Sequence, residues 1–148
     1  MKDNLQIDNQ LCFKVYSASK SIVRFYNPLL KDINLTYPQY LVMLVLWQDK
    51  SIYFKNLSCR LRMKTGTLTP IITKLESFGY LQRKKDKSDD RKINVVITED
   101  GEKLKEKAND IPDKIACSLN LSKEEYIHYM KEFNGFLIKL EAIEKYCE

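Results

Sequence analysis

The sequence is poor in the residues that build metal centres and catalytic triads. It contains a single histidine, His128, and its four cysteines are scattered without C-x-x-C spacing: Cys12, Cys59, Cys117 and Cys147. This pattern argues against a structural zinc site, a Ser/His/Asp triad and the disulfide framework of a small secreted protein. In a reducing compartment the cysteines are thiols, so any bond between them is conditional. We expect no metal and no cofactor.

Long hydrophobic runs are also missing. No apolar stretch approaches the length of a membrane span, and residues 1–4 lack the apolar region of a signal peptide. We therefore expect a cytoplasmic protein without membrane contact. Repeats and flexible linkers are absent too, and 148 residues are most simply one domain with its own core. The net charge of +5, without a dense cationic tail, suits a polyanionic partner.

Residues 51–98 carry the most informative pattern. A helix is predicted over residues 54–61, a turn over 63–66 and a second helix over 67–78, closed by Gly79, which suits a left-handed conformation just past a helix end. One face of the second helix is apolar at helical spacing. The opposite face has hydroxyls and one cation but no acidic group: Thr65, Thr67, Thr69, Thr73 and Lys74. This face looks suited to an anionic surface.

A basic hairpin follows these helices. Residues 80–85 and 93–97 are short runs rich in β-branched or aromatic side chains, and the tip over 86–92 is dense in cations. A helix-turn-helix followed by a two-stranded ribbon is the winged-helix arrangement, in which the second helix enters the DNA major groove. An ordinary α+β patch with a solvated loop is the alternative. The predicted fold class is mainly α with a small β-wing.

The flanking helices suggest a dimer. We expect a helix over about residues 8–30 with Asp8 or Asn9 near its cap, a buried helix with a Thr36/Gln39 capping box, a polar helix over 99–118 and a last helix after a Ser122/Glu125 capping box. The last helix is apolar at near-heptad spacing and has little core of its own to cover, so a partner chain is expected. Within one domain (1–148), segments 8–34 and 99–148 would form the dimer and 35–98 would bind DNA.

Four motifs together, in this order and spacing, resemble the MarR family, and within it the thiol-based oxidant sensors of the OhrR, MgrA, SarZ and AbfR type. They cover nearly the whole chain: Asp8-Asn9-Gln10-Leu11-Cys12-Phe13, Leu35-Thr36-Tyr37-Pro38-Gln39-Tyr40, Thr65-Gly66-Thr67-Leu68-Thr69-Pro70 and Asp89-Asp90-Arg91. The resemblance implies a homodimeric repressor of a pseudo-palindromic operator in double-stranded DNA. It also implies that Arg91 reaches the minor groove. The DNA-binding residues expected are Lys64, Thr65, Gly66, Thr67, Thr69, Pro70, Thr73, Lys74, Arg83, Lys85, Asp89 and Arg91.

The same resemblance makes Cys12 the peroxide-reactive cysteine. Its supporting tyrosines would be Tyr16, Tyr26 and Tyr37, the last two bonding it across the dimer, and Cys117 lies where some members carry a resolving thiol. Oxidation by an organic hydroperoxide would then release DNA. The sequence departs from the family at Lys64-Thr65, where an Asp-Ser pair is usual, and this change bears on phosphate contacts and base preference.

The chemistry of Cys12 is compatible with that role. Peroxides are attacked by the thiolate, and the first turns of a helix favour an anion. The alternatives are that Cys12 and Cys117 are packed core residues, that a small aromatic anion is the effector with Cys12 structural, or that the protein is a thiol peroxidase. The last would need a Pro/Thr/Arg constellation that is lacking, so we expect no enzyme activity. Cys59 is expected in the core and Cys147 exposed.

Overall fold

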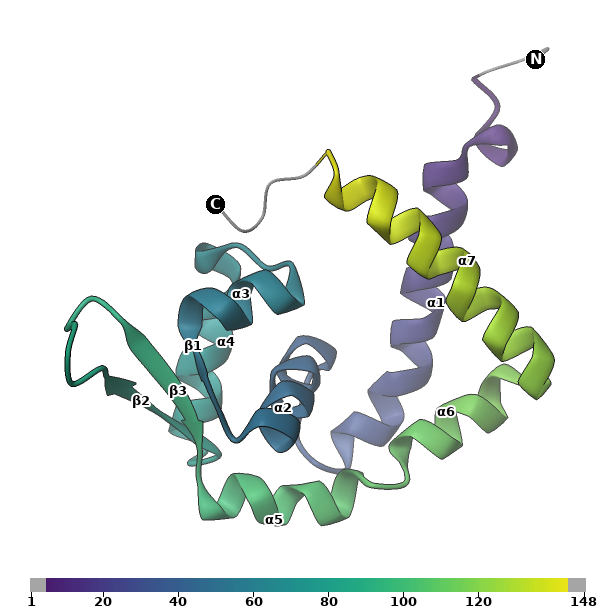
Figure 1. The fold of residues 1–148 in the computed structure, drawn as a ribbon. Helices are drawn as coiled ribbons and strands as arrows, with labels where there is room; N and C mark the ends of the chain where they lie inside the picture. The colour runs from purple at the N-terminus through teal and green to yellow at the C-terminus, as the bar shows by residue number, and fades with distance from the viewer. Residues whose placement is uncertain (1–4, 144–148) are drawn as a thin grey trace.

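The computed structural model describes residues 5–143. It is mostly helical with one small sheet, and it confirms the predicted fold class (Figure 1). The predicted core helix is α2 (Tyr37–Asp49), which begins with the expected capping box between Thr36 and Gln39. Seven of its side chains are buried, and Trp47 is only 5 % exposed, as expected for a core residue. Leu44 is 40 % exposed, so the helix is not covered all round.

The helix-turn-helix consists of α3 (Phe54–Leu61) and α4 (Thr65–Ser77). The limits of α3 are those predicted, whereas α4 begins two residues earlier than predicted. Arg62, at φ 52°, takes the left-handed conformation that ends α3, and the turn is shorter than expected. Gly79, at φ 79°, follows the end of α4 as predicted.

The sheet has three strands where two were predicted. Strands β2 (Leu81–Lys85) and β3 (Ile93–Ile97) form the antiparallel hairpin, with Leu81 opposite Ile97 and Lys85 opposite Ile93. The additional strand β1 (Ser51–Tyr53) pairs antiparallel with β3, giving the order β1-β3-β2. Three residues are too few to show a recognisable strand pattern. Their pairing also depends on a segment more than forty positions away, which no local pattern reveals.

The helix predicted after the wing is broken in two. Thr98 accepts a hydrogen bond from the Gly101 N–H and caps α5 (Glu99–Ala108), and α6 (Ile111–Leu119) follows with Pro112 in its first turn. Pro112 has no N–H to continue a helix, which explains the break. The final helix, α7 (Lys123–Glu141), has the predicted capping box between Ser122 and Glu125.

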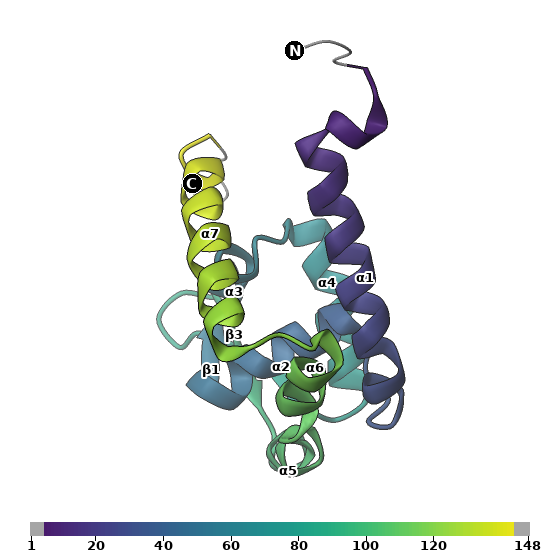
Figure 2. The same ribbon diagram turned by 90° about the vertical axis from the view of Figure 1, so that its right-hand side faces the viewer.

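The N-terminal helix also differs from its prediction. A 3-10 turn, η1 (Ile7–Asn9), precedes α1 (Leu11–Lys31), and the residue at the helix cap is Gln10, not Asp8 or Asn9. From the side, α1 and α7 rise together away from the winged-helix part, and α6 lies beside the lower half of α1 (Figure 2). None of the side chains of α7 is buried. Among residues 5–143, no helix has both the length and the apolar character needed to cross a bilayer.

Candidate nucleic-acid interface and thiol site

The exposed face of α4 contains the predicted side chains. Leu68, Ile72 and Leu75 point into the core, and this anchoring leaves the opposite side of the helix open. The open side comprises Thr65, Gly66, Thr67, Thr69, Pro70, Thr73 and Lys74, all exposed. The Thr69 hydroxyl donates to the Thr65 carbonyl oxygen at 2.8 Å, so its own oxygen remains able to accept. The face is uncharged apart from Lys74.

Lys64 occupies the N-cap position of α4, and it provides no side-chain cap. The helix N-terminus therefore keeps its N–H groups and its partial positive charge, with a cation beside them. Both features suit a phosphate oxygen. This is where the chain departs from the family pattern, and the change makes the start of α4 more positive.

Two cations of β2, Arg83 and Lys85, differ in whether an acidic side chain already pairs with them. Arg83, predicted to contact DNA, donates from its guanidinium to Glu76 at 2.6 and 2.9 Å and from its backbone N–H at 2.8 Å. These hydrogen bonds hold the pKa of Glu76 below its usual value, first through the guanidinium and then through the backbone N–H. Arg83 is therefore already neutralised, whereas Lys85 is exposed and has no ion-pair partner among the described residues.

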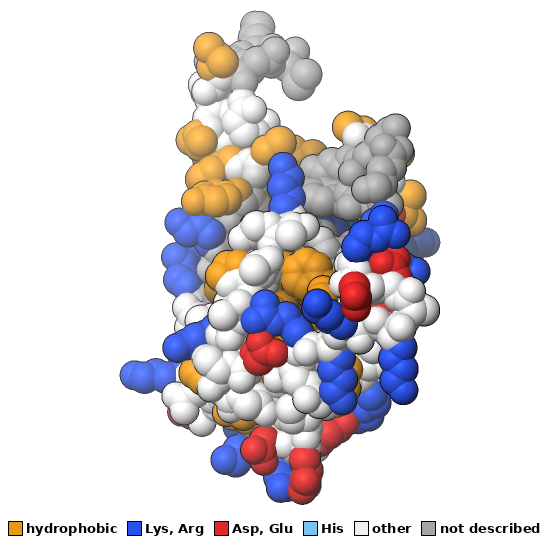
Figure 3. Space-filling model, turned by 90° about the vertical axis from the view of Figure 1, so that its left-hand side faces the viewer, with side chains coloured by type: hydrophobic (Ala, Val, Ile, Leu, Met, Phe, Trp, Pro, Cys, Tyr) orange, Lys and Arg blue, Asp and Glu red, His pale blue; other side chains and the backbone are white. Residues whose placement is uncertain are grey.

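At the wing tip, Asp89, expected among the DNA-binding residues, holds Arg91. Its carboxylate accepts from the Arg91 backbone N–H and from Nε, each at 3.1 Å, and these bonds lower the pKa of Asp89. The Arg91 side chain is nonetheless 91 % exposed. Seen from the wing side, Lys and Arg side chains are scattered over most of the surface, with fewer Asp and Glu between them (Figure 3).

Cys12 lies in the first turn of α1 and is exposed, as is Cys117 near the end of α6; both are free thiols. Within the single chain, then, neither thiol is packed in the core, which was the alternative considered for both. Cys59, expected in the core, is only half-buried, and Cys147 lies outside the described residues. Within residues 5–143, no group of three or more His, Cys, Asp or Glu side chains is arranged to hold a metal ion.

The predicted supporting tyrosines do not gather around Cys12 within one chain. Tyr26 packs against Tyr37 and Tyr40, with ring centroids 4.8 and 5.8 Å apart. Burial is the main cause that raises the pKa of all three hydroxyls, that of Tyr40 to about 12. Tyr26 lies fourteen positions beyond Cys12, about 21 Å along a helix that rises 1.5 Å per residue. Only Tyr16, one turn after Cys12, is on its own helix nearby.

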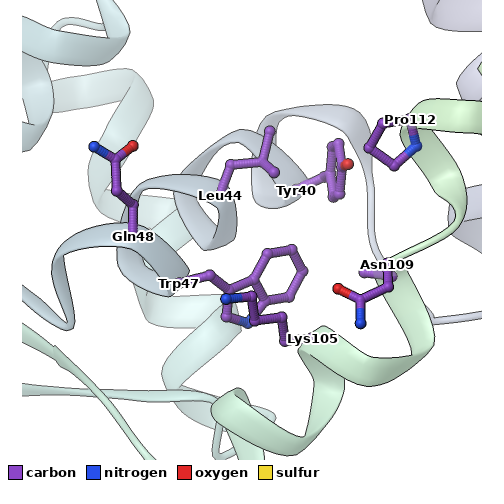
Figure 4. Close-up of a pocket in the computed structure, with 8 residues that line it drawn as sticks. Tyr40, Leu44, Trp47, Gln48, Lys105, Asn109 and Pro112 are labelled. Carbon is purple, nitrogen blue, oxygen red and sulfur yellow. The ribbon is translucent and has the colours of Figure 1, made fainter. Parts of the chain in front are cut away.

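A hollow lies between α2 and the junction of α5 and α6. It has a volume of about 340 Å³ and is lined by Tyr40, Leu44, Trp47, Gln48, Lys105, Ala108, Asn109 and Pro112. Trp47 is fixed at its edge because its Nε1 donates to the Gly101 carbonyl oxygen at 2.8 Å. In Figure 4, Trp47 and Tyr40 face Lys105, Asn109 and Pro112 across the hollow. Sequence reasoning missed this site, because its two walls, at residues 40–48 and 105–112, are more than fifty positions apart in the chain.

The geometry is that of winged helix-turn-helix proteins, and comparison with known proteins agrees. Residues 24–108 match the family described as transcriptional regulator SarA/Rot. The organic hydroperoxide resistance transcriptional regulator of Bacillus subtilis is 43 % identical over 122 residues, which are 82 % of this chain and 81 % of that protein. The regulator MgrA of Staphylococcus aureus is 32 % identical over 95 % of this chain and 93 % of its own length.

Among solved structures, reduced AbfR bound to DNA has a TM-score of 0.79 at 30 % identity, covering 96 % of this chain and 97 % of that one. The chain therefore belongs to the MarR/SarA family of transcriptional regulators. Its relatives include a regulator named for organic hydroperoxide resistance, MgrA, and AbfR, whose structure is known in reduced, overoxidised and disulfide forms.

Proposed function

We propose that this protein is a homodimeric repressor that holds a pseudo-palindromic operator while Cys12 is reduced and releases it when an organic hydroperoxide oxidises that thiol. The observation that carries the proposal is the exposed Cys12 in the first turn of α1, in a chain that also presents a threonine-lined helix and a basic wing. The relatives include a regulator named for organic hydroperoxide resistance and one solved on DNA.

The DNA would be read by α4 and the wing together. The hydroxyls of Thr65, Thr67, Thr69 and Thr73 are small enough to approach base edges or phosphates in the major groove, and Lys64 and Lys74 suit phosphate. Arg91 projects from the wing tip and would enter a narrow minor groove, with Asp89 as its support. Lys85 would contribute to the salt-dependent attraction. Arg83 would contribute less, because Glu76 already pairs with it.

Dimerisation would follow from the unburied apolar faces of α1 and α7. A groove of about 430 Å³ between these helices is lined by Leu11, Val15 and Ala18 on one side and by Tyr129, Phe133 and Phe136 on the other. Further apolar side chains of α7 are exposed, among them Tyr126, Met130 and Leu137. A second copy covering these side chains would gain the transfer free energy that the single chain leaves unused.

The same dimer would complete the thiol site. If the two α1 helices cross head to tail, the first turn of one lies beside the tyrosine end of the other. Cys12 would then meet Tyr26 and Tyr37 of the partner subunit. Both hydroxyls are protonated donors at neutral pH, and burial raises their pKa further; they would stabilise the thiolate and the sulfenic acid formed from it.

Oxidation would proceed by attack of the Cys12 thiolate on the peroxide, which transfers one oxygen to sulfur and releases the alcohol. The exposed Cys117 of the partner subunit could then attack the sulfenic acid, forming a disulfide and releasing water. Such a bond would require α1 and α6 to shift and would move the two wings relative to each other.

The test is fluorescence anisotropy with DNA selected from a random pool by the reduced protein, before and after cumene hydroperoxide. The wild-type protein should release the DNA, Cys12→Ser should bind it and ignore the oxidant, and Cys117→Ser should show whether a disulfide is needed. If the Cys12→Ser protein still dissociates on oxidation, Cys12 is not the sensor. Turnover of peroxide with a thiol reductant at rates indifferent to DNA would instead indicate a peroxidase.

The hollow beside Trp47 supports a second candidate, a small aromatic anion as effector. Its volume of about 340 Å³ is at the lower end of ligand pockets, and it combines aromatic walls with the cation Lys105 and the amides of Gln48 and Asn109. Release of DNA by salicylate from fully reduced Cys12→Ser protein, and loss of that response in Lys105→Ala, would favour this function over oxidant sensing.

A further inference from the structure

One carboxylate organises the tip of the wing. Asp86, the first residue after β2, accepts hydrogen bonds from the Ser88 backbone N–H at 2.8 Å, the Ser88 hydroxyl at 2.5 Å and the Asp89 backbone N–H at 3.2 Å. Its own N–H donates to the Lys92 carbonyl oxygen at 2.9 Å. Hydrogen bonds to the carboxylate, first from the Ser88 hydroxyl and then from the hydroxyl of Tyr53 described below, hold the pKa of Asp86 far below its usual range. Asp86 is therefore a charged acceptor at any physiological pH.

Tyr53 supplies a hydrogen bond to this carboxylate from outside the wing. Its hydroxyl donates to Asp86 Oδ2 at 2.5 Å across 33 positions of sequence. The backbone of Tyr53 is fixed twice, because it ends β1 opposite Asn94 and occupies the N-cap position of α3. The other described partners of Asp86 lie within the tip itself, at residues 88–92. Tyr53 therefore connects the loop between β2 and β3 to the start of the helix-turn-helix.

The connection extends to the exposed cation. Asp86 holds the backbone N–H of Asp89, and Asp89 holds the backbone and Nε of Arg91. A hollow of about 410 Å³ beside this chain of contacts is lined by Tyr53, Phe54, Lys55, Asn56, Arg91, Lys92 and Ile93. The start of α3 and the cations of the tip therefore line the same hollow.

We propose that Tyr53 is a positioning residue for DNA binding: through Asp86 it fixes the wing tip relative to α4, so that Arg91 is presented at one distance from the recognition helix. The inference rests on the proposed DNA-binding function. Without the bond, the seven residues between β2 and β3 would have to be ordered when DNA binds, and that entropic cost would appear as weaker binding.

The test compares Tyr53→Phe, which removes one oxygen atom, with Tyr80→Phe, a half-buried tyrosine of the same region whose hydroxyl has no hydrogen bond among the described residues. Each is titrated by anisotropy with the selected operator, and its thermal unfolding is recorded. Tyr53→Phe should bind about three- to tenfold more weakly with an unchanged unfolding midpoint, as expected for one lost hydrogen bond. Tyr80→Phe should bind like the wild type.

A double-mutant cycle with Arg91→Ala separates positioning from a direct contact of Tyr53 with DNA. If Tyr53 acts through the wing tip, Tyr53→Phe should cause little further loss in the Arg91→Ala background. In the protein that retains Arg91, Tyr53→Phe should also reduce the preference for A·T-rich over G·C-rich DNA beneath the wing, because that preference depends on an arginine held at a narrow minor groove. Asp86→Ala should reproduce both effects and exceed them.

The outcomes distinguish failure of the proposed DNA-binding mode from failure of the positioning role of Tyr53. If Arg91→Ala leaves DNA binding unchanged, the wing is not part of the interface and the proposed mode of DNA binding fails. If Arg91→Ala weakens binding but Tyr53→Phe does not, or if the two losses are additive, the positioning role of Tyr53 is overturned while the DNA-binding function stands.

Discussion

The winged-helix part of this chain is complete in itself, whereas the outer helices are not. In α2, seven of thirteen residues are buried, and Val42, Met43 and Leu46 are entirely inaccessible. In α7, which is longer, no side chain is buried: seven of its large apolar residues are 38–66 % exposed, and Phe136 and Leu140 are half-buried. The same apolar residue types thus stabilise the first part directly and the second only if something covers them.

This difference has an energetic consequence. A fully buried Leu or Phe contributes roughly 1.5–3 kcal/mol of transfer free energy relative to an exposed one. The core residues around α2 gain that contribution when one chain folds, while the side chains of α7 gain it only on association. Stability of the outer helices should therefore depend on protein concentration, and stability of the winged-helix part should not.

The largest expected effect is on the core. Leu46→Ala should lower the free energy of unfolding by about 2–5 kcal/mol, because a fully buried side chain leaves a cavity. Leu137→Ala on α7 removes the same atoms from a side chain that is 38 % exposed, and should matter only where the dimer forms. Urea unfolding at two protein concentrations measures both. Equal losses at the lowest concentration would show that α7 is packed within the single chain.

A charge on α7 should break the association while leaving the winged-helix part folded. Phe133 is 46 % exposed and lines the groove beside α1. Phe133→Glu should raise the dimer dissociation constant by roughly 100-fold, as burying an unpaired carboxylate is costly. Sedimentation equilibrium gives the constant, and circular dichroism checks the fold. Lys131→Glu, on an exposed position of the same helix, is the charge control, and a dimer that tolerates Phe133→Glu would place the interface elsewhere.

Close packing should distinguish two glycines. A Cβ on Gly101 would lie 2.1 Å from the Tyr80 carbonyl oxygen and 2.8 Å from Ile97 Cγ1, whereas at Gly66 it would meet nothing within 4 Å. Gly101→Ala should therefore cost about 2–3 kcal/mol by overpacking. Gly66→Ala, in an exposed helix, should stabilise by about 0.5–1 kcal/mol. Thermal unfolding of the two variants provides the comparison, and similar midpoints would contradict it.

The smallest expected effect concerns pH. Arg83 lowers the pKa of Glu76 below its ordinary value of 4.5, so the pair stabilises the fold above that pH and loses its contribution as pH falls through the lower, folded value. Since Glu76 is about a third exposed, the contribution should be only about 0.5 kcal/mol. Glu76→Gln should flatten the unfolding free energy over this acidic range, and by releasing Arg83 it should tighten binding to unrelated DNA. An unchanged pH profile would contradict the first expectation.

Local signals were sufficient for most of the fold. The capping boxes at Thr36 and Ser122 and the left-handed Gly79 each act over about four residues, and all three lie where the pattern placed them. The break between α5 and α6 was also local, since Pro112 marks it, but the Lys- and Glu-rich helical composition of α5 concealed it. The start of α1 was misplaced because two polar residues precede a cap that has no side-chain bond.

The candidate site divides in the same way. The exposure of the α4 threonines follows from helical spacing, because burying Leu68, Ile72 and Leu75 turns the opposite face outward. The neutralisation of Arg83 by Glu76, by contrast, depends on how the end of α4 meets β2, which spacing along the sequence does not describe. The distance between Cys12 and the half-buried Tyr26 likewise follows only once α1 is known to run from Leu11 to Lys31.

By itself, then, the sequence determined the helices, their order, the wing and the family, because capping, apolar periodicity and turn residues act between near neighbours in the chain. Tertiary structure alone decided the pairing of β1 with β3, the bond from Tyr53 to Asp86 and the hollow beside Trp47. Each of these joins residues more than thirty positions apart. Such contacts depend on how completed elements pack, and no local preference encodes that packing.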